Sequence, residues 1–163
     1  MSAPEPIART KTVLDLFLDA SRAGDLELVR NLLRWGADVN WQDVADELRT
    51  GLHCAAIMEH GDVVDLLLAQ PGVDVNIRDE YNETPLMIAC YPETSEIIFR
   101  KLLQAEGIDI NCRWDDGDTP LLYCLAEGGD VDRIDLAKIL LKDPRVDLHV
   151  QNDQGKFPET IAR

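Results

Sequence analysis

A five-residue segment recurs four times in this chain and sets the scale on which the chain can fold. It reads Gly-Ala-Asp-Val-Asn, Gly-Val-Asp-Val-Asn, Gly-Ile-Asp-Ile-Asn and, in a divergent fourth copy, Arg-Val-Asp-Leu-His. The copies end at Asn40, Asn76, Asn111 and His149, so they lie 36, 35 and 38 residues apart. A period of this length is the signature of stacked supersecondary units, each of which buries its apolar face against the next. Such stacks usually bind another macromolecule.

Each unit also opens in a similar way. Thr50, Thr84 and Thr119 precede apolar runs, and the last two are followed by Pro85 and Pro120. A threonine hydroxyl can accept a free backbone N–H at the start of a helix, and proline at the first helical position loses no needed donor. A second apolar run follows in each of these units and predicts a second helix with one buried stripe. These second helices are expected around 63–68, 97–103 and 136–141.

Together these elements resemble the ankyrin repeat. The opening Thr-Gly-Leu-His-Cys-Ala-Ala at 50–56, a second helix ending in Leu-Leu, and the Gly-Ala-Asp-Val-Asn closure recur in register. The resemblance implies an all-α solenoid in which antiparallel helix pairs are joined by projecting β-hairpin-like fingers. It also implies protein binding on the concave face, which the fingers and first helices form. In this family the histidine at the position of His53 hydrogen-bonds within the repeat.

The resemblance covers nearly the whole chain and divides it. An N-terminal extension at 1–11 precedes an ankyrin-repeat domain at 12–163. Its units are expected at about 12–43, 44–79, 80–113 and 114–150, with a partial fifth at 151–163. The partial unit is either a C-terminal cap or part of a longer protein, and the lack of a helix stop signal favours the second reading.

Three departures from the repeat pattern are visible. The first finger is longer, because Asn40 and Thr50 are ten residues apart where the later steps are eight. The turns between helices are longer at 91–96 and at 128–133. Pro92 cannot continue a helix, so the helix before it is expected to end near Cys90. Insertions in repeat proteins often lie on the binding face, although a tolerated loop is the alternative.

Composition limits the partners. The 31 acidic and 16 basic residues give a net charge of −15, which disfavours nucleic acid and anionic membranes and favours a basic protein or peptide. The alternative is that the acidity only keeps the chain soluble. No nucleophile–base set, phosphate-binding loop or metal spacing is present, which predicts a non-enzymatic protein with no cofactor and no small-molecule substrate. Four scattered cysteines indicate reduced thiols and an intracellular, cytoplasmic or nuclear, location.

Contact residues are expected on the fingers. Aromatic residues stand there at positions that are usually polar, and aromatic side chains are favoured interface anchors. Charged residues surround them, including an acidic run that could select a basic partner. The alternative is that the tryptophans pack between fingers and the charges are solvated. The candidates are Trp41, Arg49, Arg78, Tyr81, Glu83, Arg113, Trp114, Asp115, Asp116 and Asp118.

The closing asparagines form a second set of candidate sites. Asn40, Asn76 and Asn111 each follow Asp-Val or Asp-Ile, with a leucine eight residues before. This pattern resembles sites in ankyrin repeats that a cellular asparaginyl hydroxylase modifies, which implies hydroxylation at these three residues. The alternative is that asparagine suits the turn through side-chain hydrogen bonds to the backbone.

Overall fold

A computed structural model describes residues 12–126 and 131–158 of the chain. The described residues form short helices, with one 3-10 turn in the first finger and no strand. The elements are α1 (Val13–Ala23), α2 (Leu26–Arg34), η1 (Val44–Asp46), α3 (Gly51–Ile57), α4 (Gly61–Leu68), α5 (Pro85–Ile88), α6 (Glu96–Leu103), α7 (Pro120–Leu125) and α8 (Val131–Leu140). This confirms an all-α fold.

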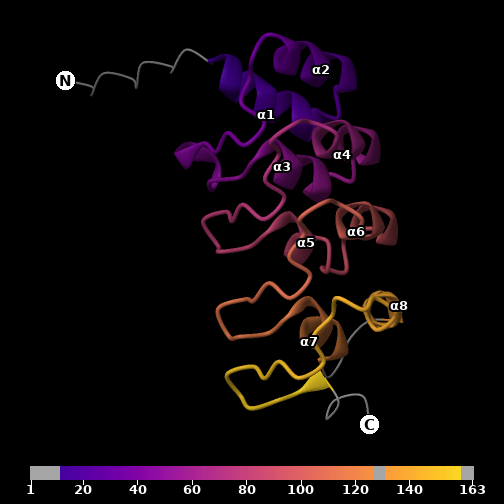
Figure 1. Ribbon diagram of the computed structural model, residues 1–163. Coiled ribbons are helices and arrows are strands. Elements are labelled where there is room, and N and C mark those ends of the chain that lie inside the picture. The colour runs from indigo at the N-terminus through magenta and orange to yellow at the C-terminus, as the bar shows by residue number, and fades with distance from the viewer. Residues whose placement is uncertain (1–11, 127–130, 159–163) are drawn as a thin grey trace, which may run out of the picture.

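The helices form two layers along an elongated stack (Figure 1). In the inner layer α1 packs against α3, and α3 against α5, with α7 next in line. In the outer layer α2, α4, α6 and α8 pack in sequence. The fingers project together from the side away from the outer layer. The second and third fingers are each closed across their base by a backbone hydrogen bond, between Asp79 N and Glu83 O at 3.0 Å and between Trp114 N and Asp118 O at 3.0 Å, so they are hairpin-like without a strand ladder.

Sequence signals account for the helix ends. The side chains of Thr50, Thr84 and Thr119 each accept the N–H three residues on, as the openings predict. Thr12 caps α1 in the same way. After α2, Gly36 adopts a φ of 92°, and its N–H donates to Leu33 O while Ala37 N donates to Leu32 O, both at 3.0 Å. That pair of bonds is the Schellman ending, for which glycine is favoured because it has no Cβ.

The two lengthened turns between helices can be followed in the structure to different extents. Before Pro92, α5 ends at Ile88, slightly earlier than Cys90, and the N–H of Tyr91 donates to Ile88 O at 3.1 Å. The longer turn at 128–133 lies mostly outside the described residues, as do the extension at 1–11 and the end of the partial fifth unit.

None of the described helices has the length and apolarity needed to cross a bilayer.

The lengthened first finger folds back onto its neighbours. Asp46, in η1, forms an ion pair with Arg22 of α1. Two consecutive residues after η1, Glu47 and Leu48, take positive φ values of 54° and 53°. The carbonyl of Glu47 accepts the N–H of Glu80, at 2.8 Å, from the next finger. The insertion is therefore fixed between α1 and the second finger.

The core is aliphatic with two fully buried phenylalanines, Phe17 and Phe99. All four cysteines are buried and free. Burial raises the pKa of Cys54 and of Cys112 to about 11, so both thiols stay protonated. A protonated buried cysteine behaves as a small apolar residue, and these thiols contribute packing to the core.

The inner helices α1 and α3 approach each other closely at Gly51. A Cβ added there would lie 2.9 Å from Phe17 Cε1 and 2.9 Å from Ser21 Oγ. Replacing Gly51 by alanine is therefore expected to lower the free energy of unfolding by about 1–3 kcal/mol, measured by urea denaturation. Gly61 is the matched control, since the nearest atom to its added Cβ would be the flexible end of Lys101 at 3.2 Å, with Ile98 at an ordinary contact distance of 3.7 Å. Gly61→Ala is expected to be neutral or stabilising; equal losses in both variants would contradict the packing argument.

Candidate functional site

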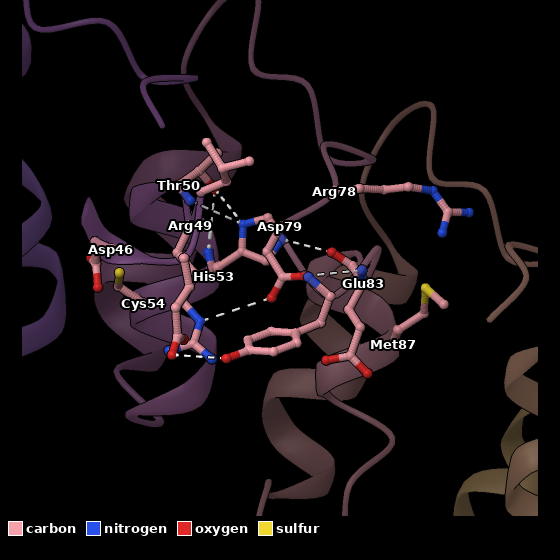
Figure 2. A network of polar contacts seen from close by, with 12 residues as sticks. Asp46, Arg49, Thr50, His53, Cys54, Arg78, Asp79, Glu83 and Met87 are labelled. Atoms are coloured by element: carbon pink, nitrogen blue, oxygen red, sulfur yellow. Dashed lines mark hydrogen bonds and ion pairs between the residues drawn. The ribbon is translucent and has the colours of Figure 1, made fainter. Parts of the chain in front are cut away.

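Residues of α3 and of the loop before it bond to the second finger, as Figure 2 shows. His53, fully buried on α3, accepts the N–H of Thr50 at Nδ1 (3.1 Å), and its Nε2 lies 3.1 Å from Glu83 O. Burial is the main cause that lowers the pKa of His53 to about 4. The ring is therefore neutral at physiological pH, with Nε2–H as the donor to Glu83. His53 thereby fixes the backbone at the base of the finger.

Asp79 shapes the same finger from within. Its Oδ1 accepts the N–H groups of Tyr81 and Glu83, both at 3.0 Å, and its side chain is fully buried. Arg49 lies beside it, with Nε 3.8 Å from Asp79 Oδ2 and Nη1 2.5 Å from Glu47 Oε2. The hydroxyl of Tyr81 donates to Glu47 Oε1 at 3.1 Å. Arg49 and Tyr81 therefore both contact the Glu47 carboxylate. The Tyr81 side chain remains 53% exposed.

Three aromatic rings gather around Glu83, where the second and third fingers meet the inner helices. Trp114 stacks on Tyr123 with centroids 4.8 Å apart, and Tyr91 contacts Tyr123 edge-on at 5.6 Å. Glu83 Oε1 accepts Trp114 Nε1–H at 2.9 Å and also the Tyr91 hydroxyl. We call Glu83, Tyr91, Trp114 and Tyr123 the aromatic cluster. Its rings are all half-buried, so each keeps an accessible part.

The charge of Glu83 is oriented but not neutralised. Both of its donors are uncharged side chains, and Glu83 forms no ion pair with any of the described residues. Burial, followed by the bond to Glu83, raises the pKa of Tyr91 above its ordinary value. The tyrosine therefore stays a neutral donor, and the carboxylate remains available to a cation.

A cation already lies beside the cluster. The Arg133 guanidinium of α8 sits 5.2 Å from the centroid of the Tyr123 ring, within the range of a cation–π interaction. Arg133 and Tyr91 also line a cleft between the 91–96 turn and α8, which holds four carboxylates besides: Glu59, Glu93, Glu96 and Asp135. The longer turn of the third unit therefore forms one wall of an acidic cleft next to the aromatic cluster.

The remaining finger charges mostly hold fingers together. Arg78 donates to Arg113 O at 3.1 Å, and Arg113 donates to Gln151 O at 2.8 Å, each reaching the next finger. Gln42 makes the equivalent bond to Arg78 O at 2.7 Å. These side chains act as struts between successive fingers, a role that the sequence analysis did not predict for Arg78 and Arg113.

The members of the acidic run, Asp115, Asp116 and Asp118, differ in their contacts and in their exposure to solvent. Asp115 accepts Asn82 Nδ2 at 2.7 Å, and Asp118 accepts Asn152 Nδ2 at 2.6 Å. Burial is the main cause that raises the pKa of Asp118 above its ordinary value. Asp115 and Asp116 are exposed at the tip of the third finger. These two carboxylates are the members of the run that face solvent.

Trp41 lies apart from this group. It is half-buried, packs against the hydrophobic core at the first finger, and its Nε1 has no hydrogen-bond partner among the described residues. Trp41 and Trp114 therefore do not share one surface patch. Of the contact residues predicted from the sequence, Glu83 and Trp114 belong to the aromatic cluster.

The closing asparagines form a ladder that joins successive units. Asn76 Nδ2 donates to Gly107 O and its Oδ1 accepts Asp109 N, both at 2.9 Å. Asn40 and Asn111 each make the same two bonds to the unit that follows. The aspartate two residues before each asparagine accepts that asparagine's own N–H. We call these bonds the asparagine ladder; hydroxylation of its three members stays a prediction, which mass spectrometry of the native protein would test.

Helix pairs in register, fingers on one side and a side-chain ladder between units define a helical-hairpin repeat protein. The family model of ankyrin repeats (3 copies) matches residues 16–113 and 62–152. The chain belongs to the ankyrin-repeat family.

Several curated proteins are similar to parts of the chain. Human rabankyrin-5 is 41% identical over 63 residues, which are 39% of this chain and 5% of that protein. I-Kappa-B like protein C2 of Microplitis demolitor bracovirus is 32% identical over 80 residues, 49% of this chain and 44% of the relative. The putative palmitoyltransferase ZDHHC13 of Danio rerio is 29% identical over 148 residues, 88% of this chain and 21% of the relative. The chain thus spans less than half the length of each.

Sequence reasoning missed three residues of the site. Tyr91 was read only as part of a turn, and Tyr123 and Arg133 were not singled out. Tyr123 is on a first helix and Arg133 on a second helix, where apolar periodicity directs attention to buried positions. The signal that could have found Tyr123 is an aromatic residue on a first helix next to an aromatic finger residue, Trp114; the sequence carries no comparable signal for Arg133. Within the described ranges, no group of three or more His, Cys, Asp or Glu side chains could hold a metal ion.

Proposed function

We propose that the chain is a non-enzymatic interaction module that binds a basic protein or peptide segment across its fingers and inner helices. Membership of the ankyrin-repeat family supports protein binding in general. The single observation that supports this face is Glu83, an unpaired carboxylate oriented by Tyr91 and Trp114. A partner lysine or arginine can pair with Glu83 and lie against the exposed parts of the rings, as Arg133 already does with Tyr123.

The other exposed groups fit the same partner. Asp115, Asp116 and Tyr81 are exposed on neighbouring fingers, and the acidic cleft lies next to the aromatic cluster. A net charge of −15 steers a basic segment toward the whole face. The same charge opposes nucleic acid and anionic membranes as ligands. An intracellular location is part of this proposal.

Partner capture by affinity purification with crosslinking mass spectrometry comes first, because it returns both the partner and the contact face. With that partner, Glu83→Gln is expected to weaken binding about tenfold, since it removes the charge but keeps an acceptor for Tyr91 and Trp114. Trp114→Ala is expected to weaken binding at least as much. Affinity is measured by isothermal titration calorimetry.

Ile97→Ala is the control, because Ile97 is 64% exposed on the outer-layer helix α6 and its loss should leave affinity unchanged. Circular dichroism confirms that each variant is folded. Unchanged affinity in Glu83→Gln would reject the aromatic cluster as the site. Crosslinks confined to the outer layer would reject the face.

A second proposal is that the chain is the regulatory or targeting segment of a larger enzyme, channel or scaffold. The observation that favours it is the match along 88% of this chain to only 21% of a relative named as a putative palmitoyltransferase. Sequencing the complete native transcript tests the idea. A stop codon shortly after the codon of Arg163 would reject it.

A further inference from the structure

The outer-layer helices α2 and α4 pack side by side, on the side of the stack away from the fingers (Figure 1), and a notch lies between them. It is lined by Arg30, Leu33, Arg34, Leu66 and Gln70. Leu33 and Leu66 are only partly buried and pack on the core from outside, so the notch has an apolar floor. Arg30 and Arg34 are four residues apart on α2, which places them on one face of the helix.

Both arginines are available for a partner. The contact of Arg30 with Glu27 is long, 3.6 Å, and Glu27 is 77% exposed, so it contributes little. Arg34 forms no ion pair with any described residue. Like charges at this spacing destabilise a helix slightly, yet among the described residues the two arginines have one ion-pair partner between them, the exposed Glu27, in a chain that has 31 acidic residues. The notch is therefore a local cationic site on an acidic protein.

A large exposed aromatic residue follows directly. Trp35 is 75% exposed, the highest fraction for any aromatic residue in the described part of the chain. The fold does not need it there, because the helix ending is made by the backbone of Gly36 and Ala37. Tryptophan and arginine are the residue types most enriched where interfaces gain their binding energy.

We propose that this notch, with Trp35 beside it, is a second docking surface, and that its occupant is an acidic segment of another protein. Carboxylates of that segment pair with Arg30 and Arg34, which can each hold a carboxylate through two N–H donors. One aliphatic side chain of the segment enters between Leu33 and Leu66, and the exposed indole of Trp35, next to Arg34 in the chain, offers a further apolar contact. The surface is separate from the aromatic cluster, so both can be occupied at once.

The probe is a short fluorescein-labelled peptide of aspartate and glutamate with one central leucine, added to the full chain and followed by fluorescence anisotropy. Because the chain as a whole is strongly negative, it repels such a peptide, and any binding reports a local site. Arg30→Glu with Arg34→Glu is expected to weaken binding at least tenfold, and Trp35→Ala about threefold. Arg100→Glu with Lys138→Glu makes the same change in net charge on α6 and α8 and is expected to weaken binding far less.

A peptide with serine in place of leucine is expected to bind more weakly, which tests the apolar floor separately from the charges. Circular dichroism excludes unfolding of the charge variants. The proposal is overturned if the wild-type chain does not bind the peptide, or if both charge-reversal pairs weaken binding equally. Binding only to anionic lipid vesicles would also overturn it. Glu83→Gln is expected to leave peptide binding unchanged, so this result stands or fails independently of the proposed function.

Discussion

Acidification from neutral pH to about 4 is expected to cost the native state about 3 kcal/mol through His53 alone. The pKa of His53 is lowered from 6.5 to about 4 in the folded chain, chiefly by burial. As pH falls, the unfolded chain therefore takes up this proton before the folded chain does. The stability associated with the neutral ring is complete above about 6.5 and is lost between about 6.5 and about 4.

Urea denaturation at a series of pH values measures this loss. His53→Gln is the comparison, because glutamine can accept from Thr50 and donate toward Glu83 but does not titrate. The variant is expected to be less stable than the wild type at neutral pH. Between about pH 6.5 and about pH 4, its free energy of unfolding should fall by about 3 kcal/mol less than that of the wild type. Parallel pH profiles for the two proteins would show that His53 is not the titrating group. The NMR signal of the His53 ring should move only near pH 4.

Replacing Asn76 by alanine is expected to lower the free energy of unfolding by about 2 kcal/mol, since it deletes both bonds of the central rung of the asparagine ladder. Each bond contributes about 1 kcal/mol net because both partners can return partly to water. Asn76→Asp keeps the acceptor for Asp109 N but places a carboxylate against Gly107 O, so it should be no more stable than the alanine variant.

Gln104→Ala provides the control, since it removes an exposed amide that lies outside the ladder, and it should change stability by less than about 0.5 kcal/mol. Chemical denaturation followed by circular dichroism gives all three values. An alanine variant as stable as the wild type would mean that stacking of the helices, and not the ladder, holds successive units in register.

The fold could be predicted because its signals are local. Threonine caps, proline at the first helical position and the Schellman glycine act within a few residues of each helix end. The 36-residue period then places each unit against the next without further information. The end of α5 was predicted only approximately, because a proline sets where a helix must stop but not how many residues before it the chain turns away through three-residue bonds such as Cys90 N to Met87 O.

The site was harder to predict because it is assembled across units. Glu83 and Trp114 were identified as exposed finger residues, but their bond joins residues 31 apart. Tyr123 enters only through stacking on Trp114. Arg78 and Arg113 had the same appearance in the sequence as contact residues, yet they bond to backbone carbonyls of the following finger. A polar finger position can face either solvent or the next finger, and its residue type alone does not distinguish the two.

The struts and the asparagine ladder tie each unit only to its immediate neighbour. Mechanically, such a stack is a set of springs in series. A pull along its length is carried in full by every rung, so the weakest junction determines the force at which the chain opens. A partner that bridges two fingers adds a second spring in parallel at one junction, and would move the point of first rupture to another unit. Bound and free chains should then yield at different places under tension.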